Sequence, residues 1–494
     1  MPSNRRGWLI GAALLTFFVF VAGCLRDCLA ARRPLNGGTL RVQMRARLAS
    51  LDPREWPGDS AEVAAAGKTL GLVFERLTCV DDHGQPKPAL AIEWAHDAES
   101  KRWQFRLRPN VKFHDGAPLS PAAATEALQS WAQPGGAPRP EDRSVSASGE
   151  WLVIQSQRAM PALLTELAQG PTFIFRVAAD GSVVGTGPFR ISEWKPRERL
   201  VLAANNGHWA GRPFLDSIRI EMGIRPQQQL VDLELDKADV VELWPDQMRR
   251  AAQIGARTWS SAPVELLALV FLREHPAVQD ARLRQAIALS LDRAAIWSVL
   301  LQKQGEVAGG LLPPWLSGYA FLFRAEPQLE RARQLRAEIS SSAANPATPL
   351  KLVYDASDPL ARAVAERIAV NARDTGITMQ AIPTGPASPA SYDARLVRLR
   401  LDKTDPRAAL ESIAAGLGEA LELPPGTAAR PEQLYGAERA LLETYRVVPL
   451  AHLPETFALS TRVKNWMPPR WGGWRLEEVW LGTPPQAAPA GEKY

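Results

Sequence analysis

The stretch WQFRLRPNVKFHDG, residues 103–116, decides how we expect the chain to fold. Residues 103–108 alternate apolar and polar side chains, and a period of two predicts a strand with one buried face. Asp115-Gly116 marks a turn, and Ser120-Pro121 combines an N-cap residue with a proline at the first helical position. We therefore expect a helix over 122–131 soon after this strand.

Strand-like and helix-like segments alternate outward from this stretch. Asp280 precedes a helical segment that places Leu283, Ala286 and Ile287 on one face, and Asp292 caps a second helix. Such a mixture indicates an α/β or α+β protein of several lobes.

The composition is ordinary for a large globular protein. The 494 residues are 46% hydrophobic, enough to bury a sizeable core without disulfides or metals. The net charge of +5 is spread along the chain without a run of like charges, which argues against nucleic-acid binding. The six histidines are scattered and the three cysteines form no CxxC pair, so we expect no metal site.

The sequence contains no catalytic motif. GxSxG, HExxH and the Walker loop are absent, and the GxG at Gly185 and Gly187 has Arg190 where a dinucleotide loop needs its third glycine. Nothing places a nucleophile, a base and an orienting group together. We therefore expect no enzyme and no cofactor.

The N-terminus has the pattern of an export signal. Two arginines precede the uncharged apolar run 9–22, which is short for a membrane span and suits the core of a signal peptide. The run ends in Val21-Ala22-Gly23-Cys24, small residues before a cysteine, as lipoprotein processing requires. We expect 1–23 to be a lipoprotein signal peptide, Cys24 to carry the lipid anchor, and 24–36 to form a tether.

Two other interpretations of this segment stay open. Cys28-Leu29-Ala30 could form an ordinary cleavage site, or the apolar run could remain uncleaved as an anchor. All three interpretations place the bulk of the protein outside the cytoplasm, in the periplasm or at the cell surface.

Several segments resemble one known family in order and spacing. They are GGTLRV at 37–42, LDP at 51–53, LVFERL at 72–77, PALAIEW at 88–94, the stretch at 103–116, GTGPF at 185–189, NNGHW at 205–209, and the helix pair at 280–296. The chain thereby resembles the extracellular solute-binding proteins of family 5, the peptide and nickel class that serves ABC importers. The resemblance covers about residues 37–320 well.

This resemblance implies a mixed α/β fold with two lobes and a hinged cleft. Lobe I would take 37–265, with an inserted subdomain near 61–183, and the returning segment 446–483; lobe II would take 266–445, and 484–494 would be a flexible tail. Two crossing strands near 264–272 and 447–453 would act as hinges.

The resemblance also implies a function. A monomer held at the membrane by its lipid would trap a small peptide or peptide-like solute by lobe closure and deliver it to ABC permease subunits. A nickel chelate, a sugar or a heme stays open as the ligand. A sensor or scaffold role, with an altered pocket, is the alternative.

In peptide-binding members, an Asp-Tyr-x-Asp-Pro-like segment supplies the acid that pairs with the α-amino group of the ligand. Asp402-Lys403-Thr404-Asp405-Pro406 keeps both acids and the proline, so the resemblance implies that Asp402 recognises an amine. Lys403 replaces the aromatic residue, which weakens the inference to peptides in particular.

The strand expected over 395–402 places Arg398, Arg400 and Asp402 on one face. These arginines could bind a ligand carboxylate, neutralise Asp402, or belong to a surface or interlobe salt-bridge network. Trp56 and Phe271 are further ligand-binding candidates, because their positions in this architecture approach the cleft.

Overall fold

The computed structural model describes residues 34–57, 60–81, 84–132, 143–320, 326–340, 349–385, 391–401, 403–423, 430–467 and 474–482. The expected signal peptide, Cys24, most of the tether, Asp402 and the tail 484–494 lie outside these residues. In the part of the chain that is described, no helix combines the length and the apolar character needed to cross a membrane.

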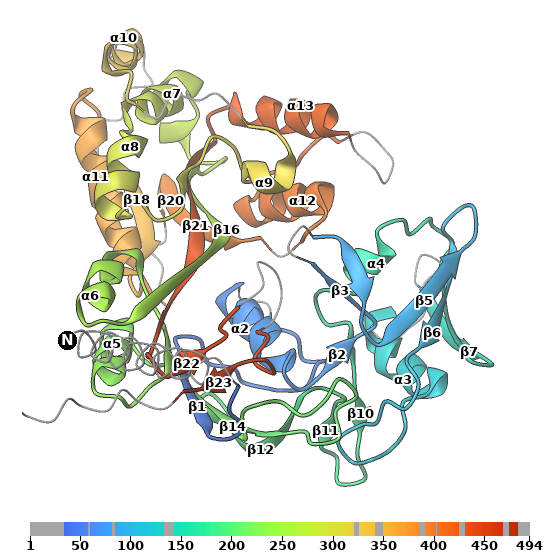
Figure 1. Ribbon diagram of the computed structural model, residues 1–494. Helices are drawn as coiled ribbons and strands as arrows, with labels where there is room; N and C mark the ends of the chain where they lie inside the picture. The colour runs from blue at the N-terminus through green and yellow to red at the C-terminus, as the bar shows by residue number, and fades with distance from the viewer. Residues whose placement is uncertain are drawn as a thin grey trace, which may run out of the picture.

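Two long antiparallel strands run through the middle of the molecule and join its two halves (Figure 1). They are β16 (Arg257–Phe271) and β21 (Val447–Leu459). β21 is almost wholly buried, as is the second half of β16, which explains their nearly continuous apolar sequence. Both strands overlap the crossing segments expected from the sequence, and both extend further toward lobe I.

One large mixed sheet contains these two strands at its centre. Beyond β21 it continues through β15 (Val240–Glu242), β1 (Thr39–Met44), β14 (Ser217–Met222), β13 (Arg199–Ala204) and β12 (Phe189–Lys195). Beyond β16 it continues through β20 (Ala394–Arg400), β18 (Leu350–Asp355) and β19 (Met379–Thr384), while β17 (Glu306–Val307) pairs with β21. Both halves of the molecule are therefore built on the same sheet.

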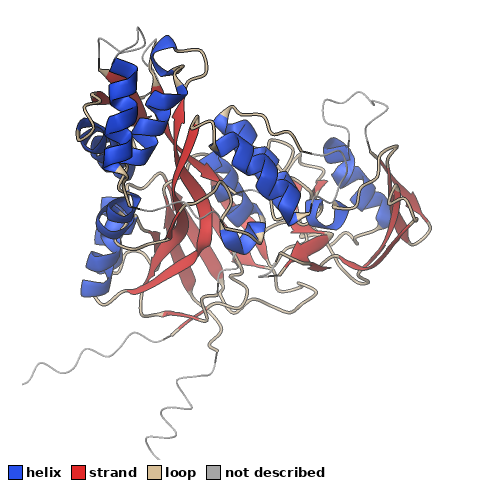
Figure 2. Cartoon of the chain, turned by 90° about the horizontal axis from the view of Figure 1, so that it is seen from above, coloured by secondary structure: helices blue, strands red, loops and turns tan. Residues whose placement is uncertain are grey.

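Helices cover the sheet in both halves (Figure 2). The first half carries α2 (Ser60–Leu70), α5 (Pro226–Glu234) and α6 (Met248–Gln253). The second carries α7 (Ala281–Ser290), α8 (Arg293–Ala295), α9 (Pro314–Ser317), α10 (Leu329–Ser340), α11 (Pro359–Arg373), α12 (Pro406–Leu417) and α13 (Pro431–Leu442).

Side chains of β16 alternate between two cores in the second half. Leu267, Leu269 and Phe271 belong to the core that contains α7 and α11, whereas Ala268 and Val270 belong to the core under α12 and α13. This is the alternation that a strand imposes. The first half has its own large core, so each half is a separately packed lobe.

A four-stranded sheet stands to one side of the first lobe (Figure 1). Its order is β5 (Ala91–His96), β6 (Arg102–Leu107), β8 (Trp151–Gln155) and β7 (Ser144–Ser148), and α3 (Pro121–Ala132) packs on it. The remaining short elements of this lobe are β2 (Glu75–Arg76), β3 (Thr78–Val80), β4 (Pro86–Pro88), α4 (Leu163–Glu166), β9 (Phe173–Ile174), β10 (Arg176–Val177), β11 (Val183–Val184), β22 (Val463–Lys464) and β23 (Trp480–Leu481).

The local predictions around residues 103–116 are confirmed. β6 occupies the alternating stretch with Trp103 and Phe105 buried, and α3 follows within one residue of its expected bounds at each end. The helix pair is confirmed in part. The carboxylate of Asp280 caps α7, and that of Asp292 accepts a hydrogen bond from the backbone N–H of Ala295 at 2.8 Å. The second helix, however, is only α8 before the chain continues as a π-helical turn at Ile296–Leu300.

Segments that carried the family resemblance meet in the fold of lobe I. The backbone N–H of Gly187 donates to the carbonyl of Val73 at 2.9 Å, and that of Phe189 donates to Leu72 at 3.0 Å. The N–H of His114 donates to the carbonyl of Gly185 at 2.9 Å. These segments join the subdomain to the main sheet.

We predict that Gly185→Ala destabilises the protein. A Cβ at this position would lie 2.1 Å from the carbonyl oxygen of Val73, so the backbone must shift, at a cost of about 2 kcal/mol. The measurement is the free energy of unfolding in denaturant. Gly436→Ala in α13 is the control: its added methyl meets open space and should leave stability equal or slightly higher. Equal stability of the Gly185→Ala variant would contradict the close approach.

Candidate functional site

A cavity of ≈570 Å³ lies between the two lobes and is lined by both. Lobe I contributes residues from the end of β1, α2, the β14–α5 connection and β15; lobe II contributes the start of α11 and β20. The crossing strands β16 and β21 and the end of β18 supply the rest. Charged side chains dominate the lining: Arg45, Lys68, Arg225, Glu242, Glu265, Asp355, Asp358, Arg398, Arg400 and Glu455.

The carboxylate of Glu455, on β21, connects the lobes. Its Oε1 lies 2.6 Å from Nζ of Lys68, on helix α2 of lobe I, and 2.5 Å from Nη1 of Arg400, on strand β20 of lobe II. The three side chains are only 18%, 6% and 15% exposed, respectively. One oxygen on a crossing strand is therefore the shared partner of a cation from each lobe.

Glu242 extends this arrangement into lobe I. Its carboxylate accepts hydrogen bonds from the backbone N–H and the guanidinium Nε of Arg45, at 2.8 and 3.1 Å. The same carboxylate lies 3.8 Å from Nζ of Lys68, which thus sits between Glu242 and Glu455.

Glu265 extends the arrangement into lobe II. It stands opposite Arg400 in the pairing of β16 with β20, pairs closely with Arg398, and lies 4.0 Å from Arg400. Arg398 also lies 3.5 Å from Asp358. Four cations and four acids therefore alternate along one chain of contacts, which we call the cleft network: Arg45, Glu242, Lys68, Glu455, Arg400, Glu265, Arg398 and Asp358.

Trp244 lies beside the cleft network. The guanidinium carbons of Arg45 and Arg398 lie 4.3 and 5.0 Å from the centre of its ring. Guanidinium groups are weakly hydrated and stack on aromatic faces, so the buried indole gives both arginines a favourable surface besides their acids. Trp244 thereby contacts one cation from each lobe.

The contacts of the network shift the pKa values of several of its members. Burial alone would raise the pKa of Glu455, but Arg400 and Lys68 hold it at about 2. Burial likewise acts to raise the pKa of Glu242, and Arg45 and Lys68 lower it. Burial acts to lower the pKa of Arg400, yet Glu455 and Glu265 raise it above its ordinary value. The network contains four basic and four acidic side chains, so their formal charges sum to zero.

The structure brings two of the expected ligand-binding residues to the cavity. Arg398 and Arg400 line it, and both belong to the interlobe salt-bridge network that was one of the alternatives open from the sequence. Their partners are Glu265, Glu455 and Asp358. Asp402 lies outside the described residues.

The other two expected residues lie elsewhere. Phe271 is 1% exposed in a core of lobe II and is not among the residues that line the cavity. It shares a face of β16 with Glu265 and Leu267, which do line it, but stands about 13 Å beyond Leu267 along the strand. Trp56 is half-buried against the core of lobe I, with its ring 6.1 Å from that of Phe173. It does not line the cavity either.

Sequence reasoning missed Lys68, Glu242, Trp244, Glu265 and Glu455. Lys68, Glu265 and Glu455 come from three separate elements, and Glu242 and Trp244 come from the end of β15 and the residues after it, so no local spacing connects the set. The sequence offered one signal for them: each crossing strand contains an acidic residue within a mostly apolar segment. Charged residues are rarely buried unless they are paired, so Glu265 and Glu455 could have indicated partners within the cleft.

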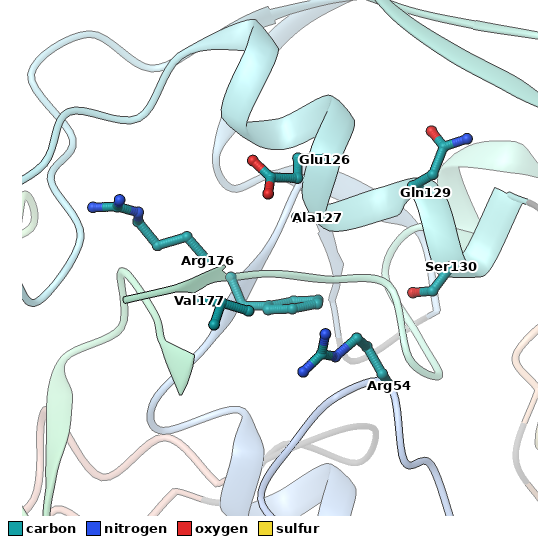
Figure 3. Close-up of a pocket in the computed structure, with 8 residues that line it drawn as sticks. Arg54, Glu126, Ala127, Gln129, Ser130, Arg176 and Val177 are labelled. Atoms are coloured by element: carbon teal, nitrogen blue, oxygen red, sulfur yellow. The ribbon is translucent and has the colours of Figure 1, made fainter. Parts of the chain in front are cut away.

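A second hollow, of ≈310 Å³, lies within lobe I alone (Figure 3). Glu126, Gln129 and Ser130 of α3 line it, together with Arg54 from the loop after β1. Arg54 is paired with Asp52 at 2.5 Å, and Arg176 with Asp115 at 2.5 Å. Because none of the described residues of lobe II lines this hollow, closure of the lobes does not enclose a solute there.

Comparison with known proteins places the chain in a family. The sequence model described as bacterial extracellular solute-binding proteins, family 5 Middle, matches residues 85–420, more than half of the chain. The chain belongs to family 5 of these solute-binding proteins. Its relatives are substrate-binding proteins of transport and not enzymes.

Two relatives of known name come from Escherichia coli K12. The probable D,D-dipeptide-binding periplasmic protein is 25% identical over 249 residues, which are 47% of this chain and 48% of the relative. The nickel-binding periplasmic protein is 25% identical over 348 residues, 63% and 66% of the two chains. The chain thus spans about half to two thirds of the length of these relatives.

Solved structures of the family share the two-lobed fold. The ABC transporter substrate-binding protein CtaP of Listeria monocytogenes superposes with a TM-score of 0.74 at 16% identity, over 90% of this chain and 99% of the other. NikA of Brucella suis, solved in complex with Fe(III)-EDTA, gives 0.76 at 19% identity, over 90% and 100%. At these identities the likeness shows the fold alone.

We predict that Glu455→Gln destabilises the protein by about 3 kcal/mol at pH 7, because it leaves Lys68 and Arg400 buried without their shared acid. The pKa of Glu455 is about 2 in the folded protein, below its ordinary 4.5, so the stabilisation is present above pH 4.5 and lost as pH falls toward 2. Unfolding in urea from pH 7 to pH 2 should therefore show the two proteins converging in acid.

Glu443→Gln is the matched control for this comparison. Glu443 pairs with Arg439 at 2.7 Å, but both side chains are more than half exposed, so the change should cost at most ~0.5 kcal/mol. A Glu455→Gln variant as stable as this control at pH 7 would contradict a structural role for the shared carboxylate.

Proposed function

We propose that this protein is the substrate-binding subunit of an ABC-type importer, which captures a small peptide or peptide-like solute between its lobes. The observation that carries the proposal is the cavity of ≈570 Å³, lined by both lobes of a family 5 fold. A volume of this size suits a small solute. Relatives named for peptide binding and for nickel binding support the transport role and leave the choice between ligands to experiment.

Capture depends on closure of the lobes about the crossing strands. Lobe I comprises 37–265 with 446–483, and lobe II comprises 266–445, so only β16 and β21 need to bend. Contacts that form on closure include the ion pair between Arg400 and Glu455. They also include a hydrogen bond of 3.0 Å from Nε2 of Gln169 to Oγ1 of Thr404. The permease then recognises the closed form and receives the solute.

Within the cavity, we assign recognition of the ligand's amino group to Asp402. It follows directly on β20 and Leu401, beyond Arg400, whose side chain lines the cavity. Arg398 and Arg400 already have acidic partners, which supports a role in shaping the cavity over one in holding a ligand carboxylate. Trp56 and Phe271 are not part of the proposed site.

The experiment is native mass spectrometry of the full chain, released in detergent from its own host's envelope. We expect a co-purifying small molecule that is lost on mild denaturation. Asp402→Asn should then weaken its binding by at least ~1.5 kcal/mol, about tenfold, because a charged hydrogen bond is lost. Asp405→Asn is the control, since the carboxylate of Asp405 caps α12 through the N–H of Ala408. Equal affinity of the wild type and the Asp402→Asn variant would remove Asp402 from the site.

A sensor or scaffold on the same fold is the second candidate function. The cleft network favours it, because eight charges that neutralise one another need no ligand to satisfy them. An empty protein, whose melting temperature is unmoved by peptide, metal-chelate and sugar panels, would favour this role over transport.

We further propose that Cys24 carries the lipid that holds the protein to a membrane outside the cytoplasm. The sequence pattern before Cys24 supports this assignment. Cys24→Ser should move the protein from the membrane fraction to the soluble fraction. Cys79→Ser, which removes an exposed thiol of lobe I, should leave it at the membrane. Membrane retention of the Cys24→Ser variant would indicate an uncleaved apolar anchor.

A further inference from the structure

The charged lining of the cavity contains two groups outside the cleft network. Among the described residues, ten charged ones line the cavity, and the network accounts for four cations and four acids. The remaining cation is Arg225, in the β14–α5 connection of lobe I. The remaining acid is Asp355, at the end of β18 in lobe II.

Arg225 differs from the other cations of the cavity. Its side chain is exposed, and no hydrogen bond, ion pair or ring contact joins its guanidinium to another described residue. The other four cations each lie within 4.0 Å of at least one carboxylate. A guanidinium without an acidic partner in a solute cavity is available for an anion.

Asp355 is the acid across the cavity from this group. Its Oδ1 accepts hydrogen bonds from the backbone N–H and the hydroxyl of Ser357, at 2.8 and 2.7 Å. No cation of the described residues lies within 4.0 Å of its carboxylate. Asp355 and Arg225 therefore face a common space from opposite lobes without pairing to each other.

We propose that Arg225 binds the carboxylate of the captured solute and thereby selects solutes with a free acid group. The planar fork of a guanidinium matches a carboxylate in two parallel hydrogen bonds. Arg398 and Arg400, the arginines expected for this task from the sequence, are engaged by Glu265, Asp358 and Glu455. A ligand carboxylate at Arg225 disturbs none of these pairs.

This inference rests on the proposed function, because it requires a peptide-like solute in the cavity. It goes beyond that function because it names the residue that binds the carboxylate of the solute. This residue belongs to lobe I and lies outside the segment that carries Asp402. In the competing hypothesis, Arg225 does not contact the solute. The lobes close further, and Arg225 forms an ion pair with Asp355 within the protein.

The test compares two ligand forms on three proteins. The full chain in detergent is mixed with di- and tripeptides as free acids, and with the same peptides as C-terminal amides. Native mass spectrometry selects the tightest-binding sequence, and calorimetry then measures Kd for its acid and its amide. The proteins are the wild type, Arg225→Gln, and Arg249→Gln as a control. Arg249 is an exposed arginine of α6 that does not line the cavity.

We expect the wild type and the control to bind the acid about tenfold more tightly than the amide, and Arg225→Gln to bind both equally. Equal loss of affinity for acid and amide, reproduced by Asp355→Asn, would show that Arg225 acts by pairing across the cleft and would overturn the proposal. An unchanged preference for the acid in Arg225→Gln would also overturn it. Binding of neither mixture by the wild type would contradict the peptide-like solute itself, and the role of Arg225 with it.

Discussion

The carboxylate of Glu455 is the interaction on which the two-lobed arrangement depends. It stands on a crossing strand, receives Lys68 from one lobe and Arg400 from the other, and is buried with both. A buried carboxylate is costly unless cations satisfy it, and these cations are held on separate lobes. The charge on one side chain therefore couples the relative position of the lobes to the stability of the whole chain.

The rest of the cleft follows from this constraint. Once Lys68 and Arg400 are fixed at Glu455, Glu242 and Glu265 compensate their remaining charge, and Arg45 and Arg398 compensate those acids in turn. Trp244 lies against Arg45 and Arg398, one cation from each lobe. The result is a cavity with strongly polar walls and little net charge, in which a solute meets few free ionic partners. Under the proposed function, the few free charges at the cavity are therefore the groups that would decide selectivity.

The sequence predicted the framework better than the site. The period-two alternation predicted β6, and the N-cap serine followed by a proline predicted α3. Both signals are local in the sequence. The family resemblance placed the crossing strands because it carries information on topology. The cleft network depends on strand register instead: Glu265 faces Arg400 only because β16 and β20 pair as they do. Phe271 shows the same limit, since it shares a face of β16 with Glu265 and Leu267, which line the cavity, but lies too far along the strand to line it.

We propose that the space between the lobes is the place where a solute is held. The most direct test is a crystal structure of the protein purified together with its co-purifying solute. We expect density for that solute inside the cavity, beside Arg225 and the intact cleft network. A solute bound in the lobe I hollow under α3, or on the outer surface with the cavity closed around water, would contradict it.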